Sequence, residues 1–205
     1  MELTKEVLKE FFDKSDEEKC YKKEVYLENI DPSENDLAPD KVKKLLKWKD
    51  PRYLSDPTKE GKPNKKVQKV LENIEKINKF RKKELTEEEK KEFENMHIFD
   101  SGDVYNTFIK HIARPLEYPI YDTHVLNAFL RLKLGYSKQD LYNEYKKFFF
   151  ALYEAAFGKD EPKTAERMKK VDNALFNYDK YEKTGQKVDE ALKRLRLNPN
   201  QTKED

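Results

Sequence analysis

The stretch EYPIYDTHVLNAF, Glu117 to Phe129, joins a proline-containing loop to an apolar helical pattern. Asp122 stands directly before that pattern, where an aspartate side chain commonly accepts hydrogen bonds from the first backbone N–H groups of a helix. Apolar residues then recur at the spacing of one helix face: Val125, Leu126, Phe129 and Leu132. The stretch therefore predicts a helix that runs from Asp122, as its N-cap, up to Gly135.

Helical periodicity extends over most of the chain. One long helix is predicted by a single apolar face: Val67, Val70, Leu71, Ile74, Ile77 and Phe80. Shorter helices are predicted to start near Pro39, at the capping box TEEE (86–89), before Val104 and at SKQD (137–140), with two more around 168–175 and 188–195. Pro115 should end the helix that contains Val104. Because no stretch combines strand periodicity with turn signals at both ends, we predict an all-α fold.

Composition favours a folded globular protein. Although 41% of the 205 residues are charged, 12 Tyr, 12 Phe and one Trp supply enough apolar area for a core. We expect one globular unit over residues 1–197 and a frayed tail over 198–205. Residues 50–64 hold three prolines and a glycine, so they should form a functional or mobile loop. Since the net charge is only +2, any nucleic-acid surface must come from the local arrangement of charges.

Several classes of site are disfavoured. Cys20 is the only cysteine, so neither a disulfide nor a four-cysteine metal cluster can form. His97, His111 and His124 show no metal-ligand spacing, and we predict neither a metal nor a cofactor. The charged start predicts no signal peptide, and the longest apolar run, FFFALY (148–153), is too short to span a membrane. We therefore expect an intracellular monomer.

The segment HIFDSGDVYNTFIKHIARPLEYPIYDTHV, His97 to Val125, combines a turn with one glycine, a helix, a loop and an Asp-Thr-His-Val sequence. Over these roughly thirty residues the chain resembles the helix-hairpin-helix DNA glycosylase superfamily, of the endonuclease III and adenine glycosylase kind. The resemblance implies a two-lobed helical fold. One lobe would span about Val42 to Leu134 and both termini would build the other, with Asp122 facing the cleft between them.

The chain also departs from that family. Its hairpin, IFDSGDV (98–104), lacks the leading proline and the first glycine of the family pattern. Bifunctional members carry a catalytic lysine two places after the last hairpin glycine, and Val104 occupies that place here. The single cysteine rules out the iron–sulfur cluster found in part of the family. These departures leave the role of the aspartate intact and predict an enzyme without lyase activity.

The resemblance implies that Asp122 is catalytic. Breaking an N-glycosidic bond builds positive charge on the deoxyribose, which an ionised carboxylate stabilises while it orients or deprotonates a water. The function expected is a monofunctional DNA glycosylase that removes a damaged or modified base and leaves an abasic site. Its partner would be duplex DNA with the target base flipped out.

Two further sets of residues follow from this reading. The base pocket or wedge would be built from aromatic side chains: Tyr121, Tyr118, Tyr105, Trp48 and Tyr53. The DNA backbone would be contacted by turn amides and basic side chains: Ser101, Gly102, Asp103, Lys110, Arg114, Lys65 and Lys66. Packing explains most aromatic residues and solvation explains most basic ones, so each assignment competes with a structural role.

Two other functions remain open. The chain could be a helical module that binds DNA or a protein without catalysis, or a different enzyme on the same scaffold. Removal of the Asp122 carboxylate separates the first two readings, because a binding module has no turnover to lose. The third would show activity without base release.

Overall fold

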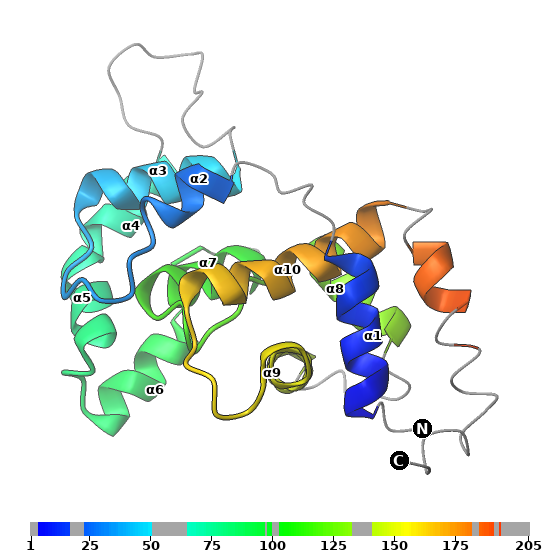
Figure 1. Ribbon diagram of the computed structural model, residues 1–205. Coiled ribbons are helices and arrows are strands. Elements are labelled where there is room, and N and C mark those ends of the chain that lie inside the picture. Colours follow the sequence, from blue (N-terminus) through cyan, green and yellow to red (C-terminus); the bar gives the residue numbers. More distant parts are fainter. Residues whose placement is uncertain are drawn as a thin grey trace, which may run out of the picture. The chain divides into compact units, whose positions relative to one another are not determined.

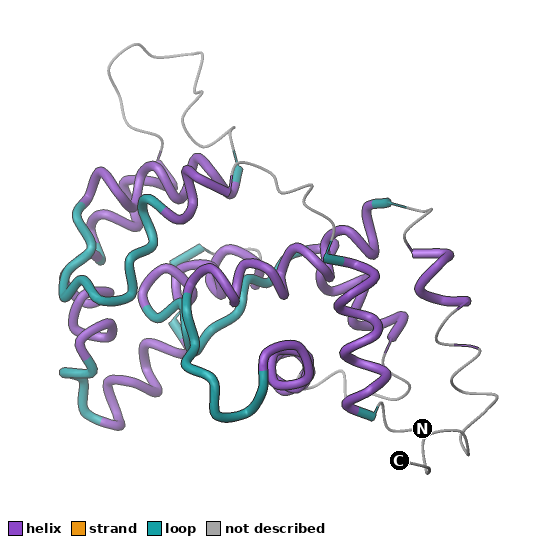
Figure 2. The backbone as a smooth tube through the Cα atoms, in the orientation of Figure 1, coloured by secondary structure: helices purple, strands orange, loops and turns teal. Residues whose placement is uncertain are grey.

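The computed structural model describes residues 4–16, 23–50, 65–96, 98–99, 103–132, 141–181, 185–190 and 193. Throughout these ranges every regular element is a helix, and no strand occurs (Figure 2). The helices labelled in Figure 1 are α1 (Lys5–Ser15), α2 (Lys23–Leu27), α3 (Pro39–Lys49), α4 (Lys65–Glu72), α5 (Ile74–Lys82), α6 (Glu87–Asn95), α7 (Asp103–Ala113), α8 (Thr123–Leu132), α9 (Leu141–Phe157) and α10 (Ala165–Lys180). Residues 185–190 are also helical. The predicted all-α fold is confirmed.

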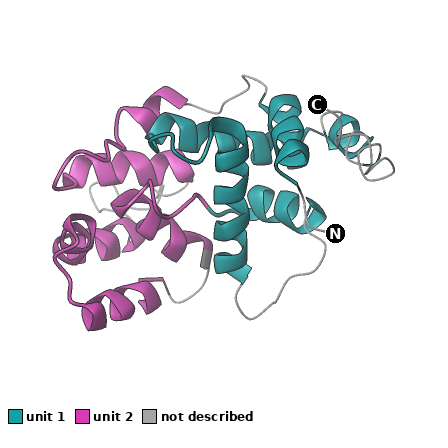
Figure 3. Ribbon diagram, turned by 60° about the horizontal axis from the view of Figure 1, so that its bottom comes forward, with its two compact units in different colours: residues 1–20, 121–205 teal, residues 21–120 magenta. Residues whose placement is uncertain are grey.

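The chain divides into two compact units, coloured separately in Figure 3. Unit 1 combines Met1–Cys20 with Tyr121–Asp205, and unit 2 is the intervening Tyr21–Ile120. The sequence placed the corresponding boundaries at about residues 42 and 134. The division therefore assigns the Asp122 helix, α8, to the unit that contains both chain ends.

Unit 1 is built around α10. This helix packs against α8, α1 and α9, so residues from both ends of the chain share one core. Phe11 on α1 meets Tyr178 on α10 edge to face, with ring centroids 5.4 Å apart. Other large side chains that are almost fully buried here include Phe129, Phe149 and Tyr153. Aromatic burial of this kind supplies the apolar area that offsets the high charge content.

Unit 2 contains α2 to α7 and has its own aromatic core. Phe80 on α5 stacks on Phe93 of α6, with centroids 4.3 Å apart, and Trp48 on α3 stacks on Phe108 of α7 at 6.2 Å. His111 is buried between two partners: its Nδ1 lies 2.6 Å from the Tyr118 carbonyl oxygen and its Nε2 lies 2.8 Å from the Tyr26 hydroxyl. Because a carbonyl oxygen only accepts, Nδ1 must donate, and in a neutral ring Nε2 then accepts a hydrogen bond from the Tyr26 hydroxyl.

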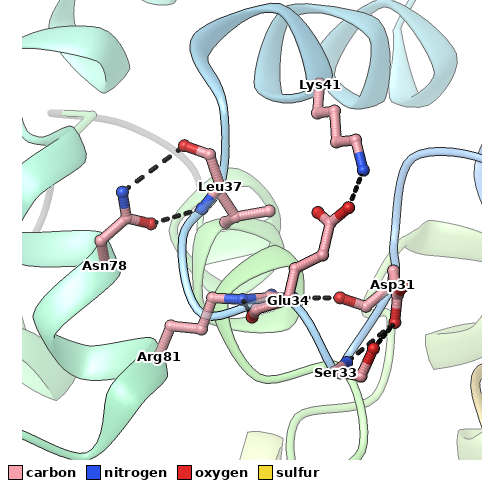
Figure 4. A network of polar contacts seen from close by, with 7 residues as sticks. All are labelled: Asp31, Ser33, Glu34, Leu37, Lys41, Asn78 and Arg81. Atoms are coloured by element: carbon pink, nitrogen blue, oxygen red, sulfur yellow. Dashed lines mark hydrogen bonds and ion pairs between the residues drawn. The ribbon is translucent and has the colours of Figure 1, made fainter.

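The Arg81 guanidinium on α5 binds two other segments of unit 2, and Figure 4 shows its contacts with the segment before α3. It donates to the Glu34 carbonyl oxygen at 2.7 Å and to that of Asp31, both before α3. It also donates to the carbonyl oxygens of Ile112 and Ala113, at 3.0 and 3.1 Å, in the last turn of α7. A cation at a helix C-terminus opposes the negative end of the helix dipole and satisfies carbonyls that lack intrahelical donors.

Capping residues explain several helix boundaries. Thr86 and Glu89 form the predicted capping box of α6, with both reciprocal hydrogen bonds present. Pro39 occupies the first turn of α3, and α7 ends at Ala113, before Pro115. These three boundaries agree with the sequence analysis.

The long helix predicted from Val67 to Phe80 is wrong, because α4 ends at Glu72 and α5 begins at Ile74. The break lies at Asn73. Its side-chain amide donates to the Lys69 carbonyl oxygen at 2.8 Å. Its backbone N–H donates to the carbonyl oxygen of Val70, three positions back, rather than to that of Lys69, four positions back. Asparagine competes in this way with the regular helix ladder, which an apolar period cannot reveal.

Within the described ranges, no helix is long and apolar enough to cross a membrane.

Candidate active site

Asp122 caps α8, as the sequence predicted. Its Oδ1 accepts hydrogen bonds from the backbone N–H groups of His124 and Val125, at 2.9 and 3.1 Å. Its carbonyl oxygen accepts the first helical bond, from Leu126, at 3.0 Å. The side chain is half-buried. Two backbone donors at the positive end of a helix therefore fix the carboxylate and stabilise its negative charge.

The chain around Asp122 packs into a group of tyrosines. The ring of Tyr121 lies 5.4 Å from that of Tyr142 and 5.3 Å from that of Tyr145, both on α9. Tyr145 is completely buried, and this burial is the first cause that raises its pKa well above the usual value. The negative charges of Asp172 and Asp122 raise it further. The charge of Asp122 thus affects a fully buried tyrosine of the same unit.

A buried ion pair lies on α10 of the same unit. Lys169 Nζ bonds Asp172 Oδ2, and both side chains are only 6% exposed. Tyr145 feels the charge of Asp172 as well as that of Asp122. The interior next to the candidate carboxylate therefore contains a second anion, which Lys169 neutralises.

His124 takes part in a separate network on unit 1. Its Nδ1 lies 2.8 Å from Asp179 Oδ2, and Asn127 donates to the same oxygen at 3.3 Å. Arg131 approaches Asp179 Oδ1 at 3.5 Å. His124, Asn127 and Arg131 lie along one face of α8. The network ties α8 to α10, so His124 has a hydrogen-bonding role in the packing of unit 1.

Three of the described aromatic residues that were predicted to line a base pocket belong to unit 2, and two of these three are core residues. Trp48 is 8% exposed and packs between Tyr26 and Phe108. Tyr118 is 6% exposed, and its hydroxyl donates to Glu94; burial followed by this hydrogen bond raises its pKa. Tyr105 is half-buried, and its hydroxyl donates to Asp50 Oδ2 at 2.7 Å.

The residues predicted to contact the DNA backbone also belong to unit 2, and those that the structure describes differ in accessibility. Lys110 donates to the Glu94 carbonyl oxygen, and Arg114, whose side chain is 11% exposed, pairs with Glu117. Lys65 and Lys66 are exposed on α4. Asp103 begins α7. Ser101, Gly102 and Tyr53 lie outside the described residues.

The candidate residues are thus divided between the units. Asp122 and Tyr121 lie together in unit 1, while the other candidates that the structure describes lie in unit 2. Sequence reasoning did not assign a site role to the polar and aromatic groups that accompany Asp122 in unit 1: Tyr142, Tyr145, Lys169, Asp172 and Asp179. A usable signal existed for Asp172, because it lies one position from Val171 and three from Leu175, on the apolar side of its helix.

Among the described residues, no group of three or more His, Cys, Asp or Glu side chains could hold a metal ion. Comparisons of the chain with protein-family models, with curated proteins and with solved structures found no match.

Proposed function

We propose that this protein is a monofunctional DNA glycosylase that hydrolyses the N-glycosidic bond of a damaged or modified base. The observation that carries the proposal is the half-buried carboxylate of Asp122, held by two backbone N–H groups at the head of α8. The resemblance of the surrounding Asp-Thr-His-Val sequence to the helix-hairpin-helix glycosylases supplies the reaction class.

The chemistry requires a fixed negative charge beside the sugar. As the C1′–N bond breaks, the bonding electrons leave with the base and positive charge develops on the deoxyribose. At roughly 4 Å and an effective dielectric near 20, a carboxylate stabilises such a charge by about 4 kcal/mol. Water then adds to C1′ and gives up a proton, the departing base takes up a proton, and an abasic site remains. The two hydrogen bonds to Oδ1 keep the carboxylate oriented, so little reorganisation accompanies the charge change.

Asp122→Asn tests the role of the charge. Asparagine is as good an N-cap as aspartate, so α8 should stay intact while the negative charge is lost. We expect base release to fall by at least about a hundredfold, and DNA affinity to persist because phosphate contacts supply most of it. Base release is measured by mass spectrometry on duplexes that carry a panel of lesions and modified bases, with helix content followed by circular dichroism.

Thr164→Ala provides the matched control. Thr164 caps α10 in the same unit through a 3.2 Å bond from the Arg167 backbone N–H, and it carries no charge. This variant loses a cap but keeps Asp122, so base release should stay near the wild-type rate. Near-normal turnover in Asp122→Asn would assign the carboxylate to capping alone. Absence of base release from every duplex would favour the non-enzymatic binding module.

The product provides a second test. Val104, at the start of α7, carries no amine and cannot form a Schiff base with the sugar. We therefore expect an intact abasic site, strand breakage only after alkali, and no covalent protein–DNA adduct on addition of borohydride during turnover. An efficient adduct that disappears when one lysine is changed would place the reactive centre elsewhere.

A further inference from the structure

The helices α3 and α4 carry the excess positive charge of the chain. Together they contain eight lysines against two carboxylates, Asp40 and Glu72, a net charge of +6. The whole chain has a net charge of +2, so all other residues together carry −4. By contrast, α6 of the same unit contains five glutamates and two lysines. The charge is therefore strongly segregated within a nearly neutral protein.

The lysines point away from the core of unit 2. On α3 the apolar residues Val42, Leu45 and Leu46 are buried, whereas Lys44 and Lys47, three positions apart, are exposed. On α4, which packs against α3, Val67 and Val70 are buried. The exposed residues there include three lysines on one face: Lys65, Lys66 and Lys69. The two helices are labelled in Figure 1.

Three exposed lysines of α3 and α4 have no carboxylate partner among the described residues, unlike several other basic residues of unit 2. Lys41 and Lys43 on α3 pair with Glu34 and Asp40, and Lys82 on α5 pairs with Asp36 and Glu84. Lys44, Lys47 and Lys65 form no ion pair with any residue that the structure describes. Lys66 Nζ lies 5.3 Å from the centroid of the Tyr105 ring. Lys44, Lys47 and Lys65 are therefore available to an anionic ligand.

We propose that Lys44, Lys47, Lys65, Lys66 and Lys69 form a binding surface for the phosphate backbone of duplex DNA. Each ammonium group on these two adjacent helices can contact a backbone phosphate, and each such contact releases a condensed counterion. Lysine acts as a point charge on a flexible stem, so this surface contributes affinity and orientation without base specificity. The choice of DNA over other polyanions rests on the proposed glycosylase function; the cationic surface itself does not.

The test neutralises four of these lysines in one variant, Lys44→Gln, Lys47→Gln, Lys65→Gln and Lys69→Gln. Glutamine is a good helix former, so α3 and α4 should remain folded. Binding to a lesion-free duplex is measured by fluorescence anisotropy at several salt concentrations. We expect about a hundredfold weaker binding near 0.1 M salt, and a plot of log affinity against log salt that is shallower by about three to four.

A control variant makes the same change in total charge at exposed lysines elsewhere: Lys5→Gln, Lys91→Gln, Lys159→Gln and Lys180→Gln. Its affinity and salt slope should stay close to those of the wild type. Equal losses in the two variants would overturn the proposal, because total charge alone would then explain binding. Wild-type protein that binds no DNA, or that binds single-stranded RNA or anionic vesicles more tightly through the same lysines, would also overturn it.

The two measurements test the DNA-binding surface and the proposed glycosylase activity independently. Asp122→Asn should bind the lesion-free duplex with wild-type affinity while it loses base release. If the lysine variant binds normally and the wild type releases bases, the surface assignment fails and the glycosylase proposal stands. If the lysine variant loses binding and no duplex releases a base, the surface assignment stands and the glycosylase proposal fails.

Discussion

The two units bury charge in opposite ways. Unit 2 buries a cation, Arg81, whose donors all go to backbone carbonyl oxygens. Unit 1 buries the ion pair of Lys169 with Asp172 and the carboxylate of Asp179, and the partners of these charges are side chains. Carbonyl oxygens are fixed by the fold itself and cannot be removed by mutation, whereas each side-chain partner can be lost. The stability of unit 2 should therefore depend on Arg81 alone among these charges. In unit 1, both members of a charged pair should be replaceable together by apolar residues with little loss of stability.

The largest effect is expected for Arg81→Met. Methionine preserves much of the buried length but leaves four backbone carbonyl oxygens without their donor, among them two in the last turn of α7. Unsatisfied buried groups of this kind cost about 1–3 kcal/mol each, so we expect a loss of about 3–5 kcal/mol in the free energy of unfolding. Urea denaturation followed by circular dichroism measures it.

Lys82→Met, on the next residue of α5, provides the control. Lys82 pairs with Asp36 and Glu84 at the surface, where such pairs contribute little. Its removal should barely move the denaturation midpoint. If Arg81→Met were no more harmful than Lys82→Met, the backbone contacts of Arg81 would not stabilise unit 2, and the contrast between the units would disappear.

In unit 1, Lys169→Met should cost about 3 kcal/mol, because it leaves the Asp172 carboxylate buried without its cation. The double change Lys169→Met with Asp172→Leu removes both charges and should recover most of that loss. Thermal unfolding of the wild type, both single variants and the double variant gives the coupling energy. A double variant that is as unstable as the sum of its single variants would show that the pair is not replaceable.

The smallest effect distinguishes the two buried tyrosines at high pH. The pKa values of Tyr145 in unit 1 and Tyr118 in unit 2 are both raised, in each case first by burial. A group whose pKa is raised on folding contributes stability that is present below its unfolded-state pKa, about 10, and is lost as pH rises beyond it. Tyr145→Phe and Tyr118→Phe should each flatten the fall in stability above about pH 10.

The tyrosine measurement is a series of urea denaturations between neutral pH and about pH 11. Tyr145→Phe should flatten the curve more, because Tyr145 is completely buried beside two carboxylates whereas Tyr118 is adjacent to the cation Arg114. Curves for both variants that parallel the wild type would mean that neither phenol controls alkaline unfolding.

The sequence predicted helix boundaries correctly where one side chain caps the helix through nearby backbone groups. Thr86 and Asp122 were assigned as caps because their side chains contact residues only two or three positions away. The break at Asn73 was missed because the apolar period continues across it. The role of Arg81 could not be inferred, since it depends on carbonyl oxygens that lie about 30 to 50 positions away in the sequence.

The candidate site was predictable only in part, for the same reason. The position of Asp122 at the head of a helix followed from its neighbours, but the surroundings of the carboxylate come from α9 and α10. Aromatic residues posed a different problem: Trp48 and Tyr118 were considered for a base pocket, yet both pack in the core of unit 2. Composition cannot separate a buried ring from an accessible one.

Two asparagine side chains of unit 2 each form hydrogen bonds with both the backbone N–H and the backbone carbonyl oxygen of one other residue. Asn78 pairs with the N–H and the carbonyl oxygen of Leu37, and Asn106 does the same with Phe99. Leu37 and Phe99 belong to no helix, yet the backbone N–H of each donates a hydrogen bond, as it would in a sheet. In heavy water these two amides should therefore keep their protons far longer than a helix-free segment normally does, and they would report the opening of unit 2 as a whole.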